Sequence, residues 1–317
     1  MKTTLLLTLS PLLSWTTSAD EPLNIHDMGK FVRQRKQEYH ANSSQIKREL
    51  AIVQDEVIFL DARIINGTET PVDAYPYLAA LYAKEYYGTE HAWCGGTLIS
   101  PSVVLTAAHC ITDSKVDEVV LGMHDMTNYD DITERNSDSV EFHTIQRSVV
   151  HPSYGVLHSH TLYMDFGLLF LDKPSNLPPI KFLNVDPARP VVGEVVTAAG
   201  WGLTDVDDWQ FANVTMEVEL DIISAKTCLE YYNDYFLPEC MVCAYRQSMD
   251  ACQGDSGGPL IGKRSNSSED ILYGVISWGY SCATENPGVY ATLSSAHDWI
   301  VTQIAEYNVT AQQRTPH

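Results

Sequence analysis

A serine set among glycines is the first feature of this sequence that could do chemistry. Ser256 lies in the segment Gly254–Pro259, which reads GDSGGP, next to an acid and four residues after Cys252. Glycines adopt backbone conformations that are closed to other residues, so neighbouring N–H groups can turn toward one point in space. A nucleophilic serine needs such donors, because negative charge develops beside it during reaction. Glycine–serine clusters also form ordinary turns, so the motif has meaning only together with a base and an orienting acid.

Two upstream segments supply the residue types that such a serine requires. His109 lies in the stretch Thr106–Cys110, TAAHC, and Asp165 opens the apolar stretch Asp165–Leu171. Histidine is a common general base, and a carboxylate can orient it. Taken singly, one of 11 histidines is more often an exposed or hydrogen-bonded side chain, and an Asp before a strand is usually a turn residue. The order His, Asp, Ser in one chain favours nucleophilic catalysis.

The segments around these residues have the pattern of an all-β protein. Short apolar runs are separated by Gly, Pro, Asn and Asp, which is typical of a barrel or a sandwich. We expect strands at Gly96–Ile99, Val103–Ala108, Gly193–Ala198, Thr215–Asp221 and Tyr273–Trp278. Helical spacing of apolar residues occurs only near the end, over Ser295–Tyr307.

Length and composition indicate a globular chain with a sizeable core. The 317 residues leave room for one large or two ordinary domains, and 44% of them are hydrophobic against 19% charged. The formal net charge is −21, from 20 basic and 41 acidic residues. Such a surface argues against binding to nucleic acid or to anionic membranes, which favour basic patches.

The first 19 residues have the pattern of a secretory signal peptide. Lys2 precedes the apolar run Leu5–Leu13, and small residues follow at Thr17–Ala19. The run is shorter than the ~20 residues that a membrane-spanning helix needs, and no other segment qualifies as an anchor. We therefore expect cleavage near Ala19 and a secreted, extracellular protein in which disulfides persist.

A change of composition marks a boundary near residue 63. Residues 20–63 contain no cysteine and hold 7 basic against 8 acidic residues, whereas residues 64–317 hold 12 against 33. The whole net charge thus belongs to the later part of the chain. Arg63 followed by Ile64 is a plausible cleavage site, although a basic residue ahead of an ordinary strand would have the same pattern.

The motifs TAAHC, DFGLL and GDSGGP in this order, the junction Arg63–Ile64 and the cysteine pattern resemble the trypsin-like branch of the chymotrypsin family of serine proteases. The resemblance runs from about Ile64 to about Tyr307. It implies an all-β fold of two six-stranded antiparallel β-barrels with a C-terminal helix. The chain would then consist of a signal peptide (1–19), a propeptide (20–63) and a peptidase domain (64–317) with a tail from about residue 308.

The resemblance also assigns roles to the three motif residues. Ser256 would attack the peptide carbonyl, and His109 would take the serine proton and pass it to the leaving amine. Asp165 would hold the imidazole in the productive tautomer. The backbone N–H groups of Gly254 and Ser256 would stabilise the oxyanion, and no cofactor is needed.

Four further positions match the substrate pocket of this family: Asp250, Ser277, Gly279 and Gly288. Asp250 would lie at the base, where a carboxylate without water gains a charge partner from a bound Arg or Lys. The two glycines would keep the pocket open. We therefore expect protein or peptide substrates cleaved after Arg or Lys, and Ala251, which offers no hydroxyl to an ammonium group, favours Arg. The alternative for Asp250 is a solvated loop acid.

Activation by cleavage is the second implication of the resemblance. A cut after Arg63 would free the amine of Ile64, which in this family folds inward and pairs with the acid before the serine, here Asp255. Because an unpaired buried charge is destabilising by ~3–5 kcal/mol, the uncut chain would be an inactive zymogen. Self-activation and activation by another protease both stay open. Asn66 stands where the family usually has Gly, and Asn66–Thr68 is a glycosylation sequon close to the new terminus.

The resemblance pairs six of the seven cysteines: Cys94 with Cys110, Cys228 with Cys243, and Cys252 with Cys282. Cys240 remains, and for it we favour a free or buried thiol over an inter-chain bond.

The acid-rich stretch between His109 and Asp165 lacks a recognisable set of metal ligands. A solvated loop is a better interpretation of it than a calcium site, so we expect no metal. We expect a monomer that is also a glycoprotein, because sequons begin at Asn42, Asn66, Asn213, Asn266 and Asn308.

Two other classes of protein share part of this pattern. Gly254–Gly258 fits the nucleophile elbow of α/β-hydrolases, but that fold needs an Asp and then a His after the serine, and only 61 residues follow Ser256. We reject that interpretation. The second class is a non-catalytic relative, a protease-shaped protein that binds or inhibits a partner. Such proteins usually lack a triad residue or have a blocked pocket, whereas His109, Asp165 and Ser256 are all present here.

Overall fold

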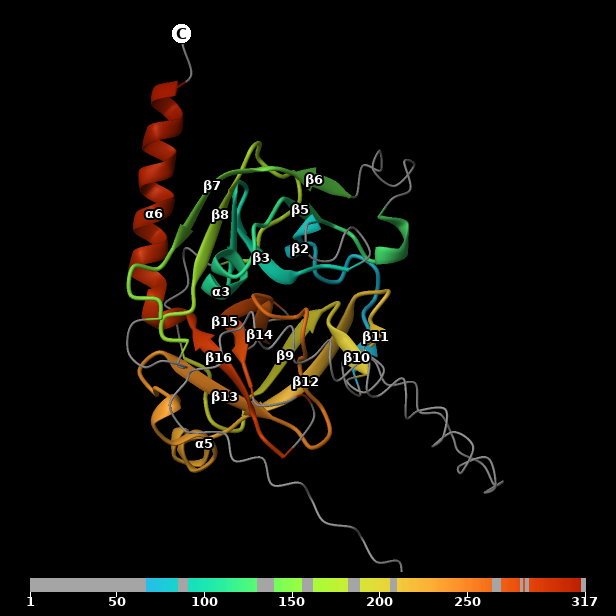
Figure 1. Ribbon diagram of the computed structural model, residues 1–317, viewed down its shortest axis with the longest axis vertical. Coiled ribbons are helices and arrows are strands. Elements are labelled where there is room, and N and C mark those ends of the chain that lie inside the picture. Colours follow the sequence, from blue (N-terminus) through green and yellow to red (C-terminus); the bar gives the residue numbers. More distant parts are fainter. Residues whose placement is uncertain are drawn as a thin grey trace, which may run out of the picture. The chain divides into compact units, whose positions relative to one another are not determined.

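The computed structural model (Figure 1) describes residues 67–84, 91–129, 140–155, 162–181, 189–205, 210–263, 269–279, 282 and 285–314. All of them belong to one unit, Leu60–His317. The expected signal peptide and propeptide, and the junction of Arg63 with Ile64, lie outside the described residues. The division of the chain at these points stays a prediction.

The first of two large antiparallel sheets has seven strands in the described part of the chain and curls toward closure. Its hydrogen-bonded order is β6 (Glu141–His143), β5 (Glu118–Leu121), β2 (Leu78–Tyr82), β3 (Cys94–Ser100), β4 (Val103–Thr106), β8 (Gly167–Leu171) and β7 (Ile145–Val150). The two edge strands β6 and β7 follow each other in the chain, with only Thr144 between them. The sheet therefore bends back on itself and forms a half-barrel.

The second sheet closes completely into a six-stranded barrel. Its order is β12 (Met216–Ile222), β13 (Met241–Tyr245), β16 (Gly288–Thr292), β15 (Asp270–Trp278), β14 (Pro259–Lys263) and β9 (Val195–Gly200), and β9 pairs again with β12. The short strand β1 (Thr68–Glu69) pairs with the first two residues of β12, Met216 and Glu217. Along β12 the side chains of Met216, Val218, Leu220 and Ile222 are buried and their neighbours are less so, as the two-residue period of a strand requires.

The smaller elements connect or cover the sheets. They are the helices α3 (Ala108–Thr112), α5 (Ala225–Tyr232) and α6 (Leu293–Arg314), the 3₁₀ turns η1 (Met126–Asn128) and η2 (Asn233–Tyr235), and the hairpin of β10 (Leu203–Asp205) with β11 (Gln210–Phe211). The expected helix at 295–307 lies inside α6, which continues to Arg314. No helix in the described part of the chain is both long enough and apolar enough to cross a membrane.

The predicted fold class is confirmed: the protein is all-β, with two antiparallel barrel-like sheets and a C-terminal helix. Within the described residues it differs from the expected pair of six-stranded barrels, because hydrogen bonds close one barrel fully and the other sheet forms a half-barrel. The expected strand 103–108 is also too long. It ends at Thr106, and the chain turns into α3, which at five residues is too short to show a helical period in the sequence.

The helix α6 packs along the half-barrel, next to β7 (Figure 1). The ring of Trp299 meets His151 edge-on at 4.8 Å, and the ring of Tyr307 lies 4.4 Å from that of Phe170. The guanidinium of Arg147 donates to Gln303 at 3.1 Å. The end of the chain therefore covers the sheet formed by its first half.

The two sheets approach each other so closely near Ser256 that only glycine fits at one position. The N–H of Gly95 in β3 donates to the carbonyl of Ser256 at 2.8 Å. Gly257 has φ +83°, and a Cβ there would lie 2.1 Å from Oγ1 of Thr106 and 2.6 Å from the carbonyl oxygen of Gly95. The serine loop of one barrel is thus fixed against β3 and β4 of the other.

Replacing Gly257 with Ala should therefore destabilise the protein more than its φ angle alone explains. The matched control is Gly155→Ala, because Gly155 has φ +75° but a Cβ at that position would have no atom of the described residues within 4 Å. The left-handed conformation costs about 1–2 kcal/mol in both variants, and overpacking adds about 1–3 kcal/mol only at Gly257. Denaturant unfolding measures both values, and equal losses would refute the close-contact argument.

Candidate active site

The register of two neighbouring strands brings the candidate acid and base together. β4 pairs with β8 so that Thr106 lies opposite Gly167. His109 follows β4 by three residues on α3, and Asp165 precedes β8 by two. Antiparallel pairing places the end of one strand beside the start of the next, so these residues meet at one edge of the half-barrel.

Asp165 is fully buried and accepts three hydrogen bonds. Its Oδ1 accepts from the backbone N–H of His109 at 3.0 Å, and its Oδ2 lies 2.8 Å from Nδ1 of the same histidine. The hydroxyl of Ser277 in β15 donates to Oδ2 at 2.6 Å. Three donors compensate a buried carboxylate for lost water, and they fix the imidazole with Nε2 directed away from Asp165.

The surroundings of His109 favour its protonated form. Burial lowers the pKa of the imidazole, but the charge and hydrogen bond of Asp165, with a smaller effect of Asp113, outweigh burial and raise the pKa overall. Asp113 is close to His109 because it caps the C-terminus of α3, where its backbone N–H donates to the carbonyl of His109. Sequence reasoning did not find Asp113, since an acid after a short helix has no distinguishing pattern.

Ser256 approaches His109 across the disulfide of Cys110. The Sγ of Cys110 lies 3.8 Å from Nε2 of His109 and 3.4 Å from the carbonyl oxygen of Ser256. The structure thus brings the three motif residues together at the contact between the sheets. Among the described residues, no hydrogen bond joins Oγ of Ser256 to the imidazole.

Two backbone donors next to Ser256 are available. Gly254 has φ +97°, a conformation that favours glycine, and neither its N–H nor that of Ser256 donates to an acceptor in the described part of the chain. Both residues are only partly buried, so the two N–H groups are free to donate to a bound anion and have the chemical character of an anion site.

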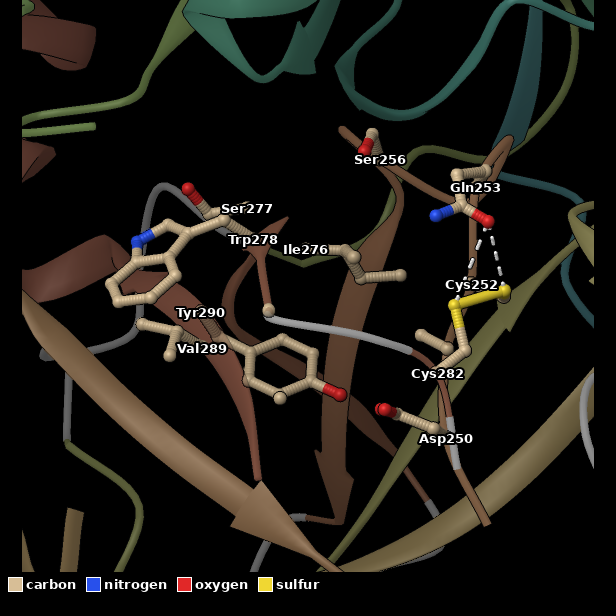
Figure 2. Close-up of a pocket in the computed structure, with 13 residues that line it drawn as sticks. Asp250, Cys252, Gln253, Ser256, Ile276, Ser277, Trp278, Cys282, Val289 and Tyr290 are labelled. Carbon is tan, nitrogen blue, oxygen red and sulfur yellow. Dashed lines mark hydrogen bonds between the residues drawn. A yellow bond between two sulfur atoms is a disulfide. The ribbon is translucent and has the colours of Figure 1, made fainter. Parts of the chain in front are cut away.

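A cavity of about 170 Å³ opens beside the serine (Figure 2). Ser256 lines one end of it, and Asp250 and Tyr290 face each other at the other end. Asp250 is 6% exposed and Tyr290 is 1% exposed. The cavity is therefore a pocket with a serine hydroxyl at one end and a carboxylate at the other.

The two expected pocket glycines have different surroundings. A Cβ on Gly288 would lie 3.0 Å from Oδ1 of Asp250 and 3.0 Å from the hydroxyl of Tyr290, so any side chain there would crowd the base. A Cβ on Gly279 would have no neighbour among the described residues nearer than 4.0 Å, so this position is less crowded than Gly288. Ser277 also lines the pocket, but its hydroxyl is engaged with Asp165.

Tyr290 is a pocket residue that sequence reasoning missed. Burial raises the pKa of its hydroxyl, and the negative charge of Asp250 raises it further. The hydroxyl is buried without a hydrogen-bond partner among the described residues. A signal existed in the sequence, because Tyr290 follows Gly288 by two residues and so points to the same side of β16.

Asp255 has a different environment from the other two carboxylates. It is fully buried, and its two oxygens accept from the N–H groups of Gly202 at 2.8 Å and Cys252 at 2.9 Å. Burial raises its pKa to about 6, although these hydrogen bonds act in the opposite direction. No cationic group among the described residues pairs with it, and its expected partner Ile64 lies outside them.

Three disulfides have the expected pairing: Cys94–Cys110, Cys228–Cys243 and Cys252–Cys282. The first holds α3 to β3, and the third forms part of the pocket wall. Cys240 is buried and forms no disulfide with the described residues, and burial raises the pKa of its thiol to about 11. A neutral buried thiol is chemically inert.

Two curled antiparallel sheets, with an Asp–His pair and a glycine-flanked serine at their contact, define the chymotrypsin fold. Comparison with known proteins narrows this class. The model of the family Trypsin matches residues 64–300, and the chain belongs to this family of serine proteases.

Three relatives illustrate the similarity. Trypsin zeta of Drosophila melanogaster is 34% identical over 268 residues, which cover 79% of this chain and 89% of that protein. Venom serine protease 34 of Apis mellifera is 32% identical over 262 residues, covering 78% and 60%. The solved structure of neuropsin, a serine protease expressed in the limbic system of mouse brain, has a TM-score of 0.63 and 30% identity, covering 75% of this chain and 99% of that one.

The raised pKa of Asp255 predicts a pH-dependent loss of stability in the uncut protein. The folded state holds the proton of Asp255 more tightly than the unfolded state, whose carboxyl has a pKa of ~3.9. The contribution of Asp255 is therefore most favourable below pH ~4 and falls by about 3 kcal/mol as the pH rises through about 6.

The measurement is the free energy of unfolding from pH 4 to 8 for the wild type and for Asp255→Asn. Subtracting the free energy of unfolding of Asp255→Asn from that of the wild type at each pH cancels the contribution of all other titrating groups. A difference that does not change with pH would contradict the environment described for Asp255.

Proposed function

We propose that this chain is a secreted serine endopeptidase that cleaves peptide bonds after Arg or Lys and is made as a zymogen. The observation that carries the proposal is the pocket, which has Ser256 at its mouth and the buried carboxylate of Asp250 at its base. A substrate side chain that reaches Asp250 would place its own carbonyl next to Ser256.

The proposed chemistry is acyl transfer. Oγ of Ser256 attacks the carbonyl carbon while Nε2 of His109 takes its proton, and His109 then gives this proton to the leaving amine. Asp165 supports this exchange because it stabilises the imidazolium through a 2.8 Å contact. The N–H groups of Gly254 and Ser256 stabilise the oxyanion, and water then releases the acyl group by the same steps. The Ser256–His109 hydrogen bond forms on substrate binding, since such contacts are often long in the free enzyme.

The preference for a cationic residue follows from the cost of burying Asp250. A carboxylate that is 6% exposed has lost most of its water, and the positive charge of a bound guanidinium or ammonium would be attracted to it there. The neighbouring hydroxyl of Tyr290 offers a further polar contact at the pocket base. Ala251 also lines the pocket and supplies no hydroxyl to an ammonium, which favours Arg over Lys.

Activation is proposed to act through Asp255. Cleavage after Arg63 frees the amine of Ile64, and its positive charge would compensate the buried carboxylate that otherwise has only two backbone donors. Asp255 lies between Gly254 and Ser256, so this ion pair would fix both oxyanion donors. Residues 20–63 would be released, since they contain no cysteine.

Secretion is supported by the sequence of residues 1–19 and by three disulfides, which persist in oxidising compartments. We further propose a monomer that acts on peptides and binds neither nucleic acid nor membranes, in keeping with its net charge of −21.

The competing proposal is a protease-shaped binding or inhibitor protein. The observation in its favour is the sequon at Asn66, because a glycan close to the new terminus would hinder the insertion of Ile64. A catalytic assay on the cleaved protein separates the two functions.

Hydrolysis of small Arg, Lys and aromatic amide substrates, before and after cleavage at Arg63, tests the proposal. We expect activity on Arg and, more slowly, on Lys only after cleavage, and a loss of about 10⁴-fold or more in Ser256→Ala. Asp250→Ser should lower kcat/KM for Arg by about 10²–10³-fold, because the cation then lacks a partner, and change the aromatic substrate far less. No activity in a sample verified to begin at Ile64 would favour the binding-protein alternative.

The rate should also depend on the protonation of His109. Only the neutral imidazole accepts the serine proton, and its pKa is raised above the ordinary ~6.5, so kcat/KM should reach half its maximum above pH ~6.5. The residual activity of Asp165→Asn should have its midpoint at lower pH, because the charge that raises the pKa is gone while burial remains. Identical midpoints in the two proteins would argue against this role of Asp165.

A further inference from the structure

Gly254 lies between Gly202, which directly precedes β10, and Phe211 in β11. A Cβ on Gly254 would lie 3.0 Å from Cα of Gly202 on one side. It would also lie 3.1 Å and 3.4 Å from Cε1 and Cδ1 of Phe211. The ring of Phe211 therefore occupies the space beside Cα of the glycine that carries one proposed oxyanion donor.

The direction of that donor is set by the peptide unit that contains it. The carbonyl of Gln253 accepts from the N–H of Leu203 at 2.8 Å. The carbonyl of Gln253 and the N–H of Gly254 belong to one planar trans peptide, so they point in opposite directions. While the Leu203 bond is made, the N–H of Gly254 points away from the hairpin. A flip of this peptide would break the bond and remove the donor.

The same hairpin also holds Asp255. The N–H of Gly202 donates to Oδ1 of Asp255 at 2.8 Å, and the adjacent Leu203 pairs with Phe211 in the β10–β11 ladder. The N–H of Ala212 donates back to the carbonyl of Gly202 at 3.1 Å. The backbone of Gly202 and Leu203 thus contacts both Asp255 and the Gly254 peptide, and Phe211 pairs with this backbone in the hairpin.

Phe211 is itself supported by the other half of the molecule. The imidazole of His91, three residues before β3, stacks on its ring with centroids 4.4 Å apart and an angle of 18°. Parallel stacking restricts both rings, because each covers a face of the other. The hairpin of the closed barrel is therefore held from the half-barrel side as well.

We propose that Phe211 is a positioning residue for the oxyanion donor of Gly254, held in place by His91. The inference rests on the proposed function, in which that N–H stabilises the oxyanion. Glycine has wide conformational freedom, and without the ring the peptide of Gln253 and Gly254 has space to rotate away from its Leu203 contact. Phe211 thereby acts on the transition state and leaves the pocket around Asp250 unchanged.

The experiment compares Phe211→Ala with the matched control Phe211→Tyr, which keeps the ring, in protein cleaved at Arg63. We expect kcat for an Arg amide to fall about 10-fold or more in Phe211→Ala with little change in KM, because a misplaced oxyanion donor costs up to about 10²–10³-fold. Phe211→Tyr should stay within about twofold of the wild type.

Two inhibitors separate positioning from a general loss of structure. An arginine peptide aldehyde adds to Ser256 and places an oxygen against the oxyanion donors, so its affinity should fall by the same factor as kcat. Benzamidine fills only the pocket with a cation and should bind Phe211→Ala and the wild type equally. Phe211→Leu serves as a second variant if Phe211→Ala does not fold.

A double-mutant cycle tests the role of His91. His91→Ala should lower kcat less than Phe211→Ala, and the double variant should be no worse than Phe211→Ala alone, because both changes act through one contact. The inference fails if Phe211→Ala keeps full kcat and aldehyde affinity against an active wild type, or if benzamidine and the aldehyde weaken equally. Inactivity of the cleaved wild type would instead contradict the proposed function.

Discussion

The burial of three carboxylates is the constraint on which the rest of this structure depends. Asp165 and Asp255 are fully buried and Asp250 is 6% exposed, and a carboxylate removed from water is costly unless donors or a cation replace its hydration. Each of the three meets this need in a different way. Asp165 has three donors within the fold, Asp255 has two backbone N–H groups and a raised pKa, and Asp250 faces a cavity that can receive a ligand. In the proposed function, Asp165 would orient the base, Asp255 would take part in activation, and Asp250 would select the substrate.

Glycines allow the close backbone approaches found around these carboxylates and between the two sheets. Gly257 approaches Thr106, and a Cβ on Gly200 or Gly202 would lie within 2.3–2.4 Å of the carboxylate oxygens of Asp255. A larger residue at Gly257 would hold the two sheets apart, and one at Gly200 or Gly202 would collide with Asp255. The site is therefore a property of the contact between the barrels and of neither barrel alone.

The sequence predicts the members of this site better than their arrangement. Residues such as Ser256, His109 and Asp165 carry motif patterns, and so do the cysteines that pair as expected. The fold class followed from regular strands and turns, but the closure of only one barrel depends on pairings between distant strands. α3 was missed because five residues show no period, and the bond from Ser277 to Asp165 joins residues 112 positions apart. Contacts of that separation leave no local signal in one sequence.

The hairpin β10–β11 explains why activation and oxyanion stabilisation would respond together. Gly202 donates to Asp255, and the next residue, Leu203, donates to Gln253 and so directs the N–H of Gly254. A positive charge that binds beside Asp255 would hold Gly202 in place. Because Leu203 is the next residue, it would be held as well, and with it the orientation of the Gly254 N–H. Phe211 pairs with Leu203 and stacks on His91. The orientation of the Gly254 N–H therefore also depends on how the two sheets pack against each other. In the proposed function, the geometry at Ser256 would then be coupled to the packing of both halves of the chain through one strand pair.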